Sequence, residues 1–209
     1  MDDLVIRNSL YYKKFSDAPF TGEVSGEVTG NINNGKRIGL WEGYHENGQL
    51  EFKGRYIKGK EEGLWEGYHN NGKLAFKGHF QEGKEDGLWE YYFDNGGIMN
   101  KGYFKGGKRH GGTQIFDSVN GDGTLVETRT YKDDKKDGPW ESYYENGQLQ
   151  DKGEYKDGKK DGLWEFYNET GLLHSRGNYK DGKQDGLWIF SMNTPYIYAV
   201  RYKDGKEVE

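Results

Sequence analysis

The sequence predicts an all-β fold: an elongated, single-layer, twisted antiparallel sheet of consecutive β-hairpins, built from 24-residue repeats. Glycine accounts for 34 of the 209 residues and aromatic residues for 16%, whereas hydrophobic residues make up only 32%. Burial must therefore rest on large rings, because a two-layer core needs more aliphatic residues. Asn-Gly pairs, the strongest short hairpin signal, separate the candidate strands. The period itself is set by tryptophan, which recurs every 24 residues in two series: Trp41, Trp65, Trp89 and then Trp140, Trp164, Trp188.

The two tryptophan series are out of phase by three residues. The next position after Trp89 is Thr113, which precedes Trp140 by 27 residues, and an insertion within Asp117–Thr124 accounts for the slip. A fixed period of this length indicates a repeat array. We predict a single repeat domain over 1–209, divided as follows: an irregular N-terminal cap and first hairpins at 1–38, regular repeats at 39–112, a degenerate repeat with the insertion at 113–139, and regular repeats with a C-terminal cap at 140–209.

Each repeat is predicted to be a hairpin that turns at its Asn-Gly pair. At Asn47-Gly48 both residues would take positive φ, as a two-residue type I′ turn requires. Asp157-Gly158 and Asp161-Gly162 are predicted to form the turn from one hairpin to the next, since Asp-Gly is common in turns. A single hairpin buries too little apolar surface to fold by itself, so the repeats must share hydrogen-bond ladders with their neighbours.

A two-residue turn at Asn-Gly fixes which residues face each other. Glu42 would face Lys53, and later repeats repeat this pair of opposite charges, which supports the register. Trp41 would face Gly54, so the indole could lie across bare backbone. Side chains alternate between the faces of a strand, which places the Trp column on one face and the Glu–Lys pairs on the other.

Composition excludes several classes of function. The net charge of −5 and the pI of about 5.6 offer no basic footprint, so we expect no nucleic-acid partner. The chain has no cysteine, which excludes disulfides and thiolate chemistry. The same negative charge disfavours membrane association, and no apolar run approaches the length of a spanning helix. The sequence as it stands is expected to be cytoplasmic, or exported to the periplasm if a signal peptide preceded Met1.

No catalytic or metal-binding motif emerges from the sequence. His45 and His69 occupy a repeat column that elsewhere holds Phe93 and Tyr144, so packing explains them. The Asp pairs near the Asp-Gly turns lack the order of a calcium loop. We therefore predict a protein that is not an enzyme, with no catalytic residue, no metal ligand and no cofactor.

The aromatic face is the best candidate for a binding surface, because contiguous exposed apolar area marks interaction sites and Tyr and Trp are favoured in hot spots. The alternative is that this face is only the hydrophobic side of the sheet, curled on itself. The irregular repeat, where Thr113 replaces Trp and Arg129 replaces Gly, is either a degenerate unit or a partner-specific bend or protrusion. The candidate binding residues are Trp41, Trp65, Trp89, Trp140, Trp164, Trp188, Phe52, Phe76, Tyr91 and Phe166.

The repeat pattern G-x-W-x-x-Y-x-x-N-G-x-L-x-x-K-G-x-Y-x-x-G-K-x-x-G is carried by Gly39–Gly63 and Gly138–Gly162. It resembles the MORN-repeat variant family, and the resemblance covers nearly the whole chain except at Thr113 and Arg129. It implies consecutive hairpins in an extended sheet. Bacterial members include YwqK-type antitoxins of toxin–antitoxin systems, and the wider class is associated with scaffolding, self-association and phospholipid contact. The family motif contains no catalytic residue.

These observations favour a non-enzymatic protein-interaction or scaffold module, such as an antitoxin or immunity-like protein. It would bind a protein partner, a toxin or an envelope protein, along its aromatic face. The alternative is a carbohydrate or cell-envelope binder that stacks its aromatic side chains on sugar rings. A phospholipid-associating module is the third hypothesis. Self-association through an unpaired edge strand is a further expectation.

Overall fold

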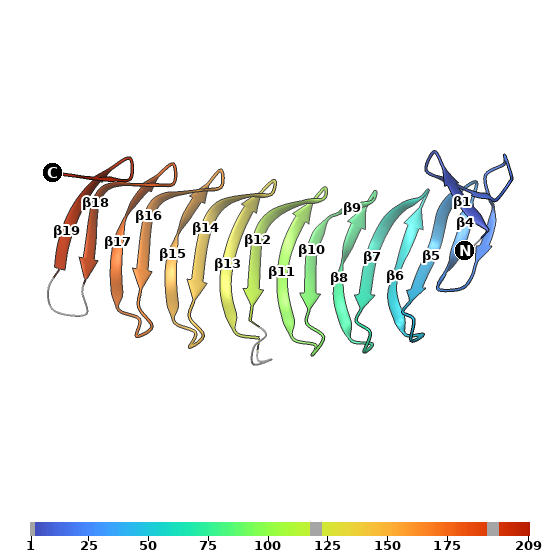
Figure 1. The fold of residues 1–209 in the computed structure, drawn as a ribbon, viewed down its shortest axis with the longest axis horizontal. Helices are drawn as coiled ribbons and strands as arrows, with labels where there is room; N and C mark the ends of the chain where they lie inside the picture. The colour runs from blue at the N-terminus through green and yellow to red at the C-terminus, as the bar shows by residue number, and fades with distance from the viewer. Residues whose placement is uncertain (1–2, 118–122, 192–196) are drawn as a thin grey trace. The chain divides into compact units, whose positions relative to one another are not determined.

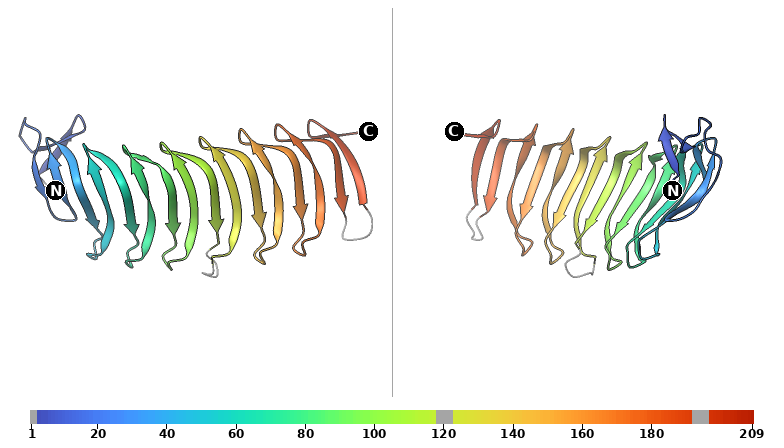
Figure 2. Two further views of the ribbon diagram at one scale, coloured as in Figure 1. Left: turned by 180° about the vertical axis from the view of Figure 1, so that it is seen from behind. Right: turned by 45° about the vertical axis from the view of Figure 1, so that its right-hand side comes forward.

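The computed structural model describes residues 3–117, 123–191 and 197–209. Every element of regular secondary structure in these residues is a β-strand (Figures 1 and 2). One long antiparallel sheet of consecutive hairpins holds 18 strands and does not close, while β1 and β2 form a separate two-stranded sheet. The predicted fold class is confirmed. The strands are β1 (Leu4–Arg7), β2 (Leu10–Lys13), β3 (Gly22–Val24), β4 (Val28–Asn33), β5 (Lys36–Tyr44), β6 (Leu50–Ile57), β7 (Lys60–Tyr68), β8 (Leu74–Gln81), β9 (Lys84–Glu85), β10 (Gly87–Tyr92), β11 (Ile98–Lys105), β12 (Lys108–Phe116), β13 (Leu125–Lys132), β14 (Lys135–Tyr143), β15 (Leu149–Lys156), β16 (Lys159–Tyr167), β17 (Leu173–Lys180), β18 (Lys183–Ser191), β19 (Ile197–Lys203) and β20 (Lys206–Val208).

The chain divides into two compact units. Unit 1 contains residues 1–98 with 104–107, and unit 2 contains 99–103 with 108–209, so that β11 contributes to both. From β3 to β9 and from β12 to β20 each strand pairs antiparallel with the next, and β8 pairs with both β9 and β10. Residues 118–122 of the predicted insertion lie outside the described residues.

The hairpin tips differ from the predicted type I′ turn. Of Asn47 and Gly48, only Gly48 has a positive φ, of 80°. The Gly48 N–H donates to the carbonyl of His45 at 2.8 Å, and the His45 N–H donates to the carbonyl of Gln49 at 2.8 Å. The loop therefore has three residues. The Asn47 side chain bridges two tips: its Oδ1 accepts from the Gln49 N–H at 3.0 Å, and its Nδ2 donates to the carbonyl of Asn70 at 2.8 Å.

The predicted register nevertheless holds beyond the tip. Gly43 faces Phe52 whereas Tyr44 faces Leu50, so Glu51 is an extra residue in the second strand. The longer loop and this bulge compensate each other. Further along the hairpin the predicted pairs occur as expected, including Glu42 with Lys53 and Trp41 with Gly54. The same pairs are present at Glu66–Lys77, Glu141–Lys152 and Glu165–Arg176.

The prediction of a turn between hairpins is confirmed at one Asp-Gly pair and wrong at the other. Asp157 and Gly158 have φ of 49° and 85°, the values of a type I′ turn. Asp161-Gly162, in contrast, lies inside β16. Three residues, 162–164, stand opposite Gly153 alone, and Gly162 has a φ of 73°. This second Asp-Gly pair forms a bulge, which lets β16 advance relative to β15.

The bulge decides which glycine each indole covers. Trp164 faces Gly177 within its own hairpin, but its ring lies on Gly153 of the preceding strand, where an added Cβ would be 2.3 Å from Cδ2. The indole Nε1 donates to the carbonyl of Glu154 at 3.1 Å. The prediction that the indole crosses the facing glycine is therefore wrong. The same arrangement recurs for Trp41 on Gly30, Trp65 on Gly54, Trp89 on Gly78 and Trp188 on Gly177.

Within each unit the indoles lie on one face and form an edge-to-face ladder with the Tyr and Phe rings between them. In unit 2 Tyr155 is 5.3 Å from Trp164 at 88°, and Tyr179 is 5.1 Å from Trp188 at 87°. Such pairs contribute about 0.5–1.5 kcal/mol each beyond their buried area. Trp41 and Trp164 have no exposed surface, so a single layer buries them completely.

The opposite face carries the predicted charge pairs, but the ion pairs join neighbouring repeats. Lys53 faces both Glu42 and Glu66, and its Nζ contacts Glu66 Oε2 at 2.7 Å. Tyr68, which donates to Glu66 at 3.1 Å, also lies beneath this ammonium. Lys77–Glu90 and Lys152–Glu165 repeat the contact at 2.8 Å. A column of exposed leucines accompanies the pairs: Leu40, Leu64, Leu88, Leu163 and Leu187.

Candidate functional site

Five of the six tryptophans predicted as binding residues are buried. Trp41, Trp65, Trp89, Trp164 and Trp188 are at most 7% exposed. A partner that leaves the fold unchanged cannot reach these rings. They form the platform on which the half-buried members of the predicted set lie: Phe52, Phe76, Tyr91, Phe166 and the sixth tryptophan, Trp140.

The half-buried rings of unit 1 form a groove on this platform. Phe52 stacks on Trp65 at 6.0 Å and 19°, and Phe76 stacks on Trp89 at 5.9 Å and 22°. Phe76 also covers Gly67, whose added Cβ would be 2.0 Å from the ring. The cavity has a volume of about 430 Å³, and its walls include His45, Glu51, Phe52, Tyr56, Trp65 and Phe76.

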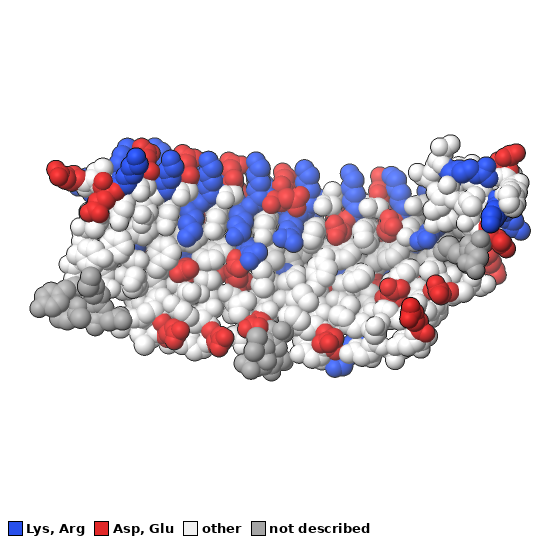
Figure 3. Space-filling view, viewed as in Figure 1, with Lys and Arg blue, Asp and Glu red and all other residues white. Residues whose placement is uncertain are grey.

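In unit 2 the polar residues Asp151 and Ser175 occupy positions equivalent to Phe52 and Phe76. Asp151 lies between Ser142 and Phe166 in the ladder. Burial raises the pKa of Asp151, although Lys160 and Ser142 oppose the shift. Lys160 places its Nζ 3.9 Å from the centre of the Trp164 ring, and burial lowers the pKa of this ammonium. On the face that Figure 3 shows, basic side chains gather over unit 2 near the turns between hairpins.

The irregular repeat changes the environment of Trp140. Arg129 stands where the other repeats have the glycine that an indole covers, and it faces Trp140 in the ladder. The Arg129 guanidinium pairs with Glu127, and Trp140 Nε1 donates to the same carboxylate instead of a backbone carbonyl. Although burial acts in the opposite direction, the hydrogen bonds from Arg129 and Trp140 lower the pKa of Glu127. Trp140 is left half-buried.

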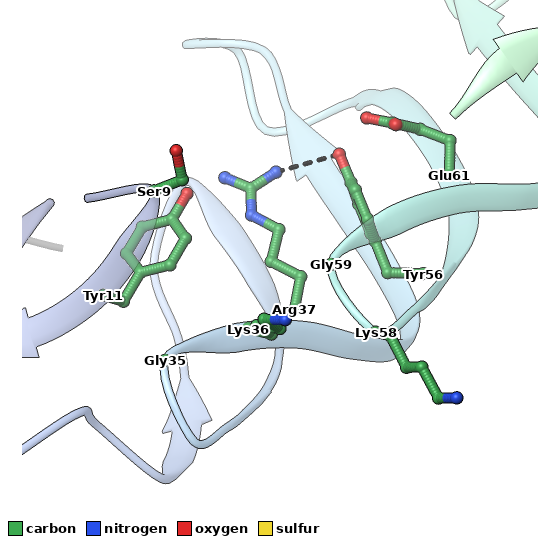
Figure 4. Close-up of a pocket in the computed structure, with 9 residues that line it drawn as sticks. All are labelled: Ser9, Tyr11, Gly35, Lys36, Arg37, Tyr56, Lys58, Gly59 and Glu61. Atoms are coloured by element: carbon green, nitrogen blue, oxygen red, sulfur yellow. Dashed lines mark hydrogen bonds between the residues drawn. The ribbon is translucent and has the colours of Figure 1, made fainter. Parts of the chain in front are cut away.

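A second cavity, of about 380 Å³, surrounds Arg37 at the N-terminal end of unit 1 (Figure 4). The guanidinium lies 4.3 Å from the centre of the Trp41 ring and 5.3 Å from that of Tyr56. Its Nη1 donates to the Tyr56 hydroxyl at 3.1 Å. The β1–β2 hairpin closes the other side, anchored by the Tyr11 N–H, which donates to the carbonyl of Gly35 at 2.9 Å.

Sequence reasoning did not find the Arg37 cavity. One signal was available: the position four residues before the Trp changes in charge, from Arg37 to Glu61 and Glu85, and is basic again at Arg109, Lys136 and Lys160. A column whose charge varies in this way is not dictated by the packing of the repeat. Tyr11 could not have been predicted as a neighbour, because only the docking of the N-terminal hairpin brings it there.

Raising the pH from 10 to 12 is expected to destabilise unit 1 through Tyr56. Burial, followed by the hydrogen bond with Glu61, raises the pKa of Tyr56 from 10.0 to about 12. Above pH 10 the unfolded chain loses this proton while the folded chain keeps it, so the free energy of unfolding falls with pH. Urea unfolding of wild type and Tyr56→Phe at pH 9, 10, 11 and 12 tests this. The pH slope should be shallower in the variant, and identical slopes would contradict the assignment.

The sequence profile of the MORN repeat variant family matches residues 37–58, 61–82, 85–105, 136–157 and 160–181, more than half of the chain. The chain belongs to the MORN repeat variant family. The MORN repeats correspond to the hairpins described above, and the region between residues 105 and 136, which contains Thr113 and Arg129, is unmatched.

No curated protein matches the chain significantly. Two solved structures show local similarity. One is a GtfA/B complex bound to UDP and GlcNAc, with 11% identity over 55% of this chain and 22% of that one. The other is a GtfA/B complex with 20% identity over 51% and 18%. Both TM-scores are 0.24. The MORN protein thus spans about a fifth of the length of these chains.

No helix long and apolar enough to cross a membrane is present in residues 3–117, 123–191 and 197–209. The same residues contain no group of three or more His, Cys, Asp or Glu side chains placed to hold a metal ion.

Proposed function

We propose that the chain is a non-enzymatic protein-interaction module that binds its partner on the aromatic face, the face of the sheet that carries the Trp column. In unit 1 the partner would insert an apolar side chain into the groove formed by Phe52, Trp65 and Phe76. A toxin, as for the YwqK-type antitoxins among bacterial members of the family, is one class of such a partner.

The observation that carries this proposal is the contrast between columns on the same face. The Trp and Gly columns are buried and nearly constant, as packing requires. The half-buried positions beside them vary: Phe52 and Phe76 in unit 1 correspond to Asp151 and Ser175 in unit 2. Where Ser175 stands, the facing Phe166 supplies the ring that stacks on an indole, whereas Phe52 and Phe76 supply it opposite glycines. The sheet therefore fixes one ring in each pair but not the strand that carries it. Partly exposed rings around a desolvated centre are typical of interaction hot spots.

Selection of random peptides on phage against the immobilised full chain tests the proposal. We expect enrichment of peptides with one large apolar residue beside Lys or Arg, because the groove is apolar and Glu51 lies at its wall. An enriched peptide should bind Phe52→Ser and Phe76→Asn at least about tenfold more weakly, equivalent to about 1.4 kcal/mol. Both substitutions copy residues found at this position in other repeats, Ser175 and Asn100.

Leu64→Ser is the matched control. Leu64 is 48% exposed on the opposite face, so its replacement should leave peptide affinity unchanged. Equal losses in the Phe76 and Leu64 variants would contradict the assignment of the face, and the absence of any enriched peptide would contradict protein binding. A glycan-array signal that Phe52→Ser abolishes, without peptide enrichment, would replace the proposal with carbohydrate binding.

A further inference from the structure

We propose that the Arg37 cavity of unit 1 binds a carboxylate group of a small ligand. This site uses a different cavity from the groove in the function proposed above, and the two proposals stand separately. The proposal rests on the Arg37 guanidinium, which aromatic side chains hold in place without neutralising its charge.

Arg37 is half-buried among aromatic side chains and has no carboxylate partner. Its guanidinium carbon lies 5.5 Å from the centre of the Tyr11 ring, in addition to its contacts with Trp41 and Tyr56. Within the part of the chain that the structure describes, no Asp or Glu oxygen lies within 4.0 Å of its nitrogens, and its Nε is buried without a hydrogen-bond partner. Partial burial of an unpaired charge is unfavourable, so an anion that enters the cavity would gain from it.

The column of Arg37 holds either charge, with Glu61 and Glu85 in the next two repeats and Arg109, Lys136 and Lys160 in later ones. The later cations also lie over aromatic rings, so a cation on a ring is compatible with the sheet alone. Arg37 differs from them because the ring of Tyr11, from the β1–β2 hairpin, lies beside it and closes a cavity around it.

The lining favours a planar monoanion. Lys36 and Lys58 also line the cavity, with the Lys58 side chain pointing away from the guanidinium (Figure 4), whereas Glu61 would repel a dianion such as phosphate. A guanidinium offers parallel N–H donors that match a carboxylate. Figure 4 shows the hydroxyls of Ser9 and Tyr11 beside the guanidinium, where they can donate to a bound oxygen. Ser9 is held at a φ of 62°, a conformation that costs a non-glycine residue energy.

Titration of the ¹⁵N-labelled full chain with N-acetylglycine tests the site by NMR. We expect saturable shifts of the Arg37 Nε–Hε resonance and of the Gly35 and Gly59 amides, which line the cavity. Half-saturation should be on the order of a few millimolar, as for a ligand held by one charged group. N-acetylglycinamide, which lacks the charge, should bind at least about tenfold more weakly, and so should inorganic phosphate.

Arg37→Glu should abolish the shifts of Gly35 and Gly59 while preserving the fold, because Glu occupies this position in the next two repeats. Arg55→Glu changes the net charge equally at an exposed position outside the cavity and should leave the titration unchanged. Shifts that persist in Arg37→Glu, equal binding of the amide, tighter binding of phosphate, or no saturable shift would each overturn the proposal. Phe76→Asn should not affect this titration, so its result is independent of the peptide-binding test.

Discussion

Trp164→Ala is expected to lower the free energy of unfolding by about 3–5 kcal/mol, the range for removal of a buried large aromatic side chain. The ring has no exposed surface and contacts the edges of Tyr155 and Tyr179 at centroid distances of 5.3 and 6.0 Å. Its Nε1 also satisfies the carbonyl of Glu154. In a single-layer sheet no second layer can move in to fill the space. Urea unfolding followed by circular dichroism measures the loss.

The neighbouring substitution Glu165→Ala provides the comparison. Glu165 lies on the opposite face and pairs with Lys152 at 2.8 Å, with the lysine side chain 43% and the glutamate side chain 15% exposed. Water reaches the lysine and screens the pair in part, so its loss should cost about 1 kcal/mol, well below the cost of losing the indole. If both substitutions destabilised the protein equally, the two faces would be wrongly assigned.

Gly153→Ala is expected to cost about 3 kcal/mol although it adds one methyl group. An added Cβ would lie 2.3 Å from Cδ2 and Cε2 of Trp164, and Gly153 has no positive φ, so the effect is one of space alone. Overpacking costs about 1–3 kcal/mol. Lifting the indole would also break its hydrogen bond to Glu154, worth about 0.5–1.5 kcal/mol. Urea unfolding again gives the measurement.

Two controls isolate this mechanism. Gly112→Ala changes a strand glycine whose added Cβ meets no atom within 4 Å, and it should be neutral or slightly stabilising. In a Trp164→Ala background Gly153→Ala should cost less than about 1 kcal/mol, because the space above Gly153 is then free. An unchanged cost in that background would show that the indole is not the cause.

Arg129 is a natural version of this substitution. It places a large side chain where the other repeats have the covered glycine, and Trp140 beside it is only half-buried and donates to the Glu127 carboxylate. The sheet tolerates arginine in place of this glycine, since β13 and β14 still pair. The Trp140 indole, however, does not lie on the backbone of the preceding strand as the other indoles do. The same displacement is what we expect from Gly153→Ala.

The two errors of sequence reasoning concern features that contact the adjacent repeat. In the three-residue loop at Asn47-Gly48, the Asn47 side chain reaches the next tip at Asn70. The bulge at Asp161-Gly162 accompanies the placement of Trp164 on Gly153 of the preceding hairpin. A pattern read within one hairpin does not contain that information.

The sequence alone determined the repeat period, the hairpin register and the assignment of the Trp and Glu–Lys columns to opposite faces, because side-chain alternation and turn residues act over a few positions along the chain. Only the tertiary structure decided which glycine each indole covers, that Lys53 pairs with Glu66 across repeats, and that Arg37 lies in a cavity against Tyr11. Those contacts join residues brought together by the stacking of hairpins, and their geometry depends on bulges whose size the local sequence does not set.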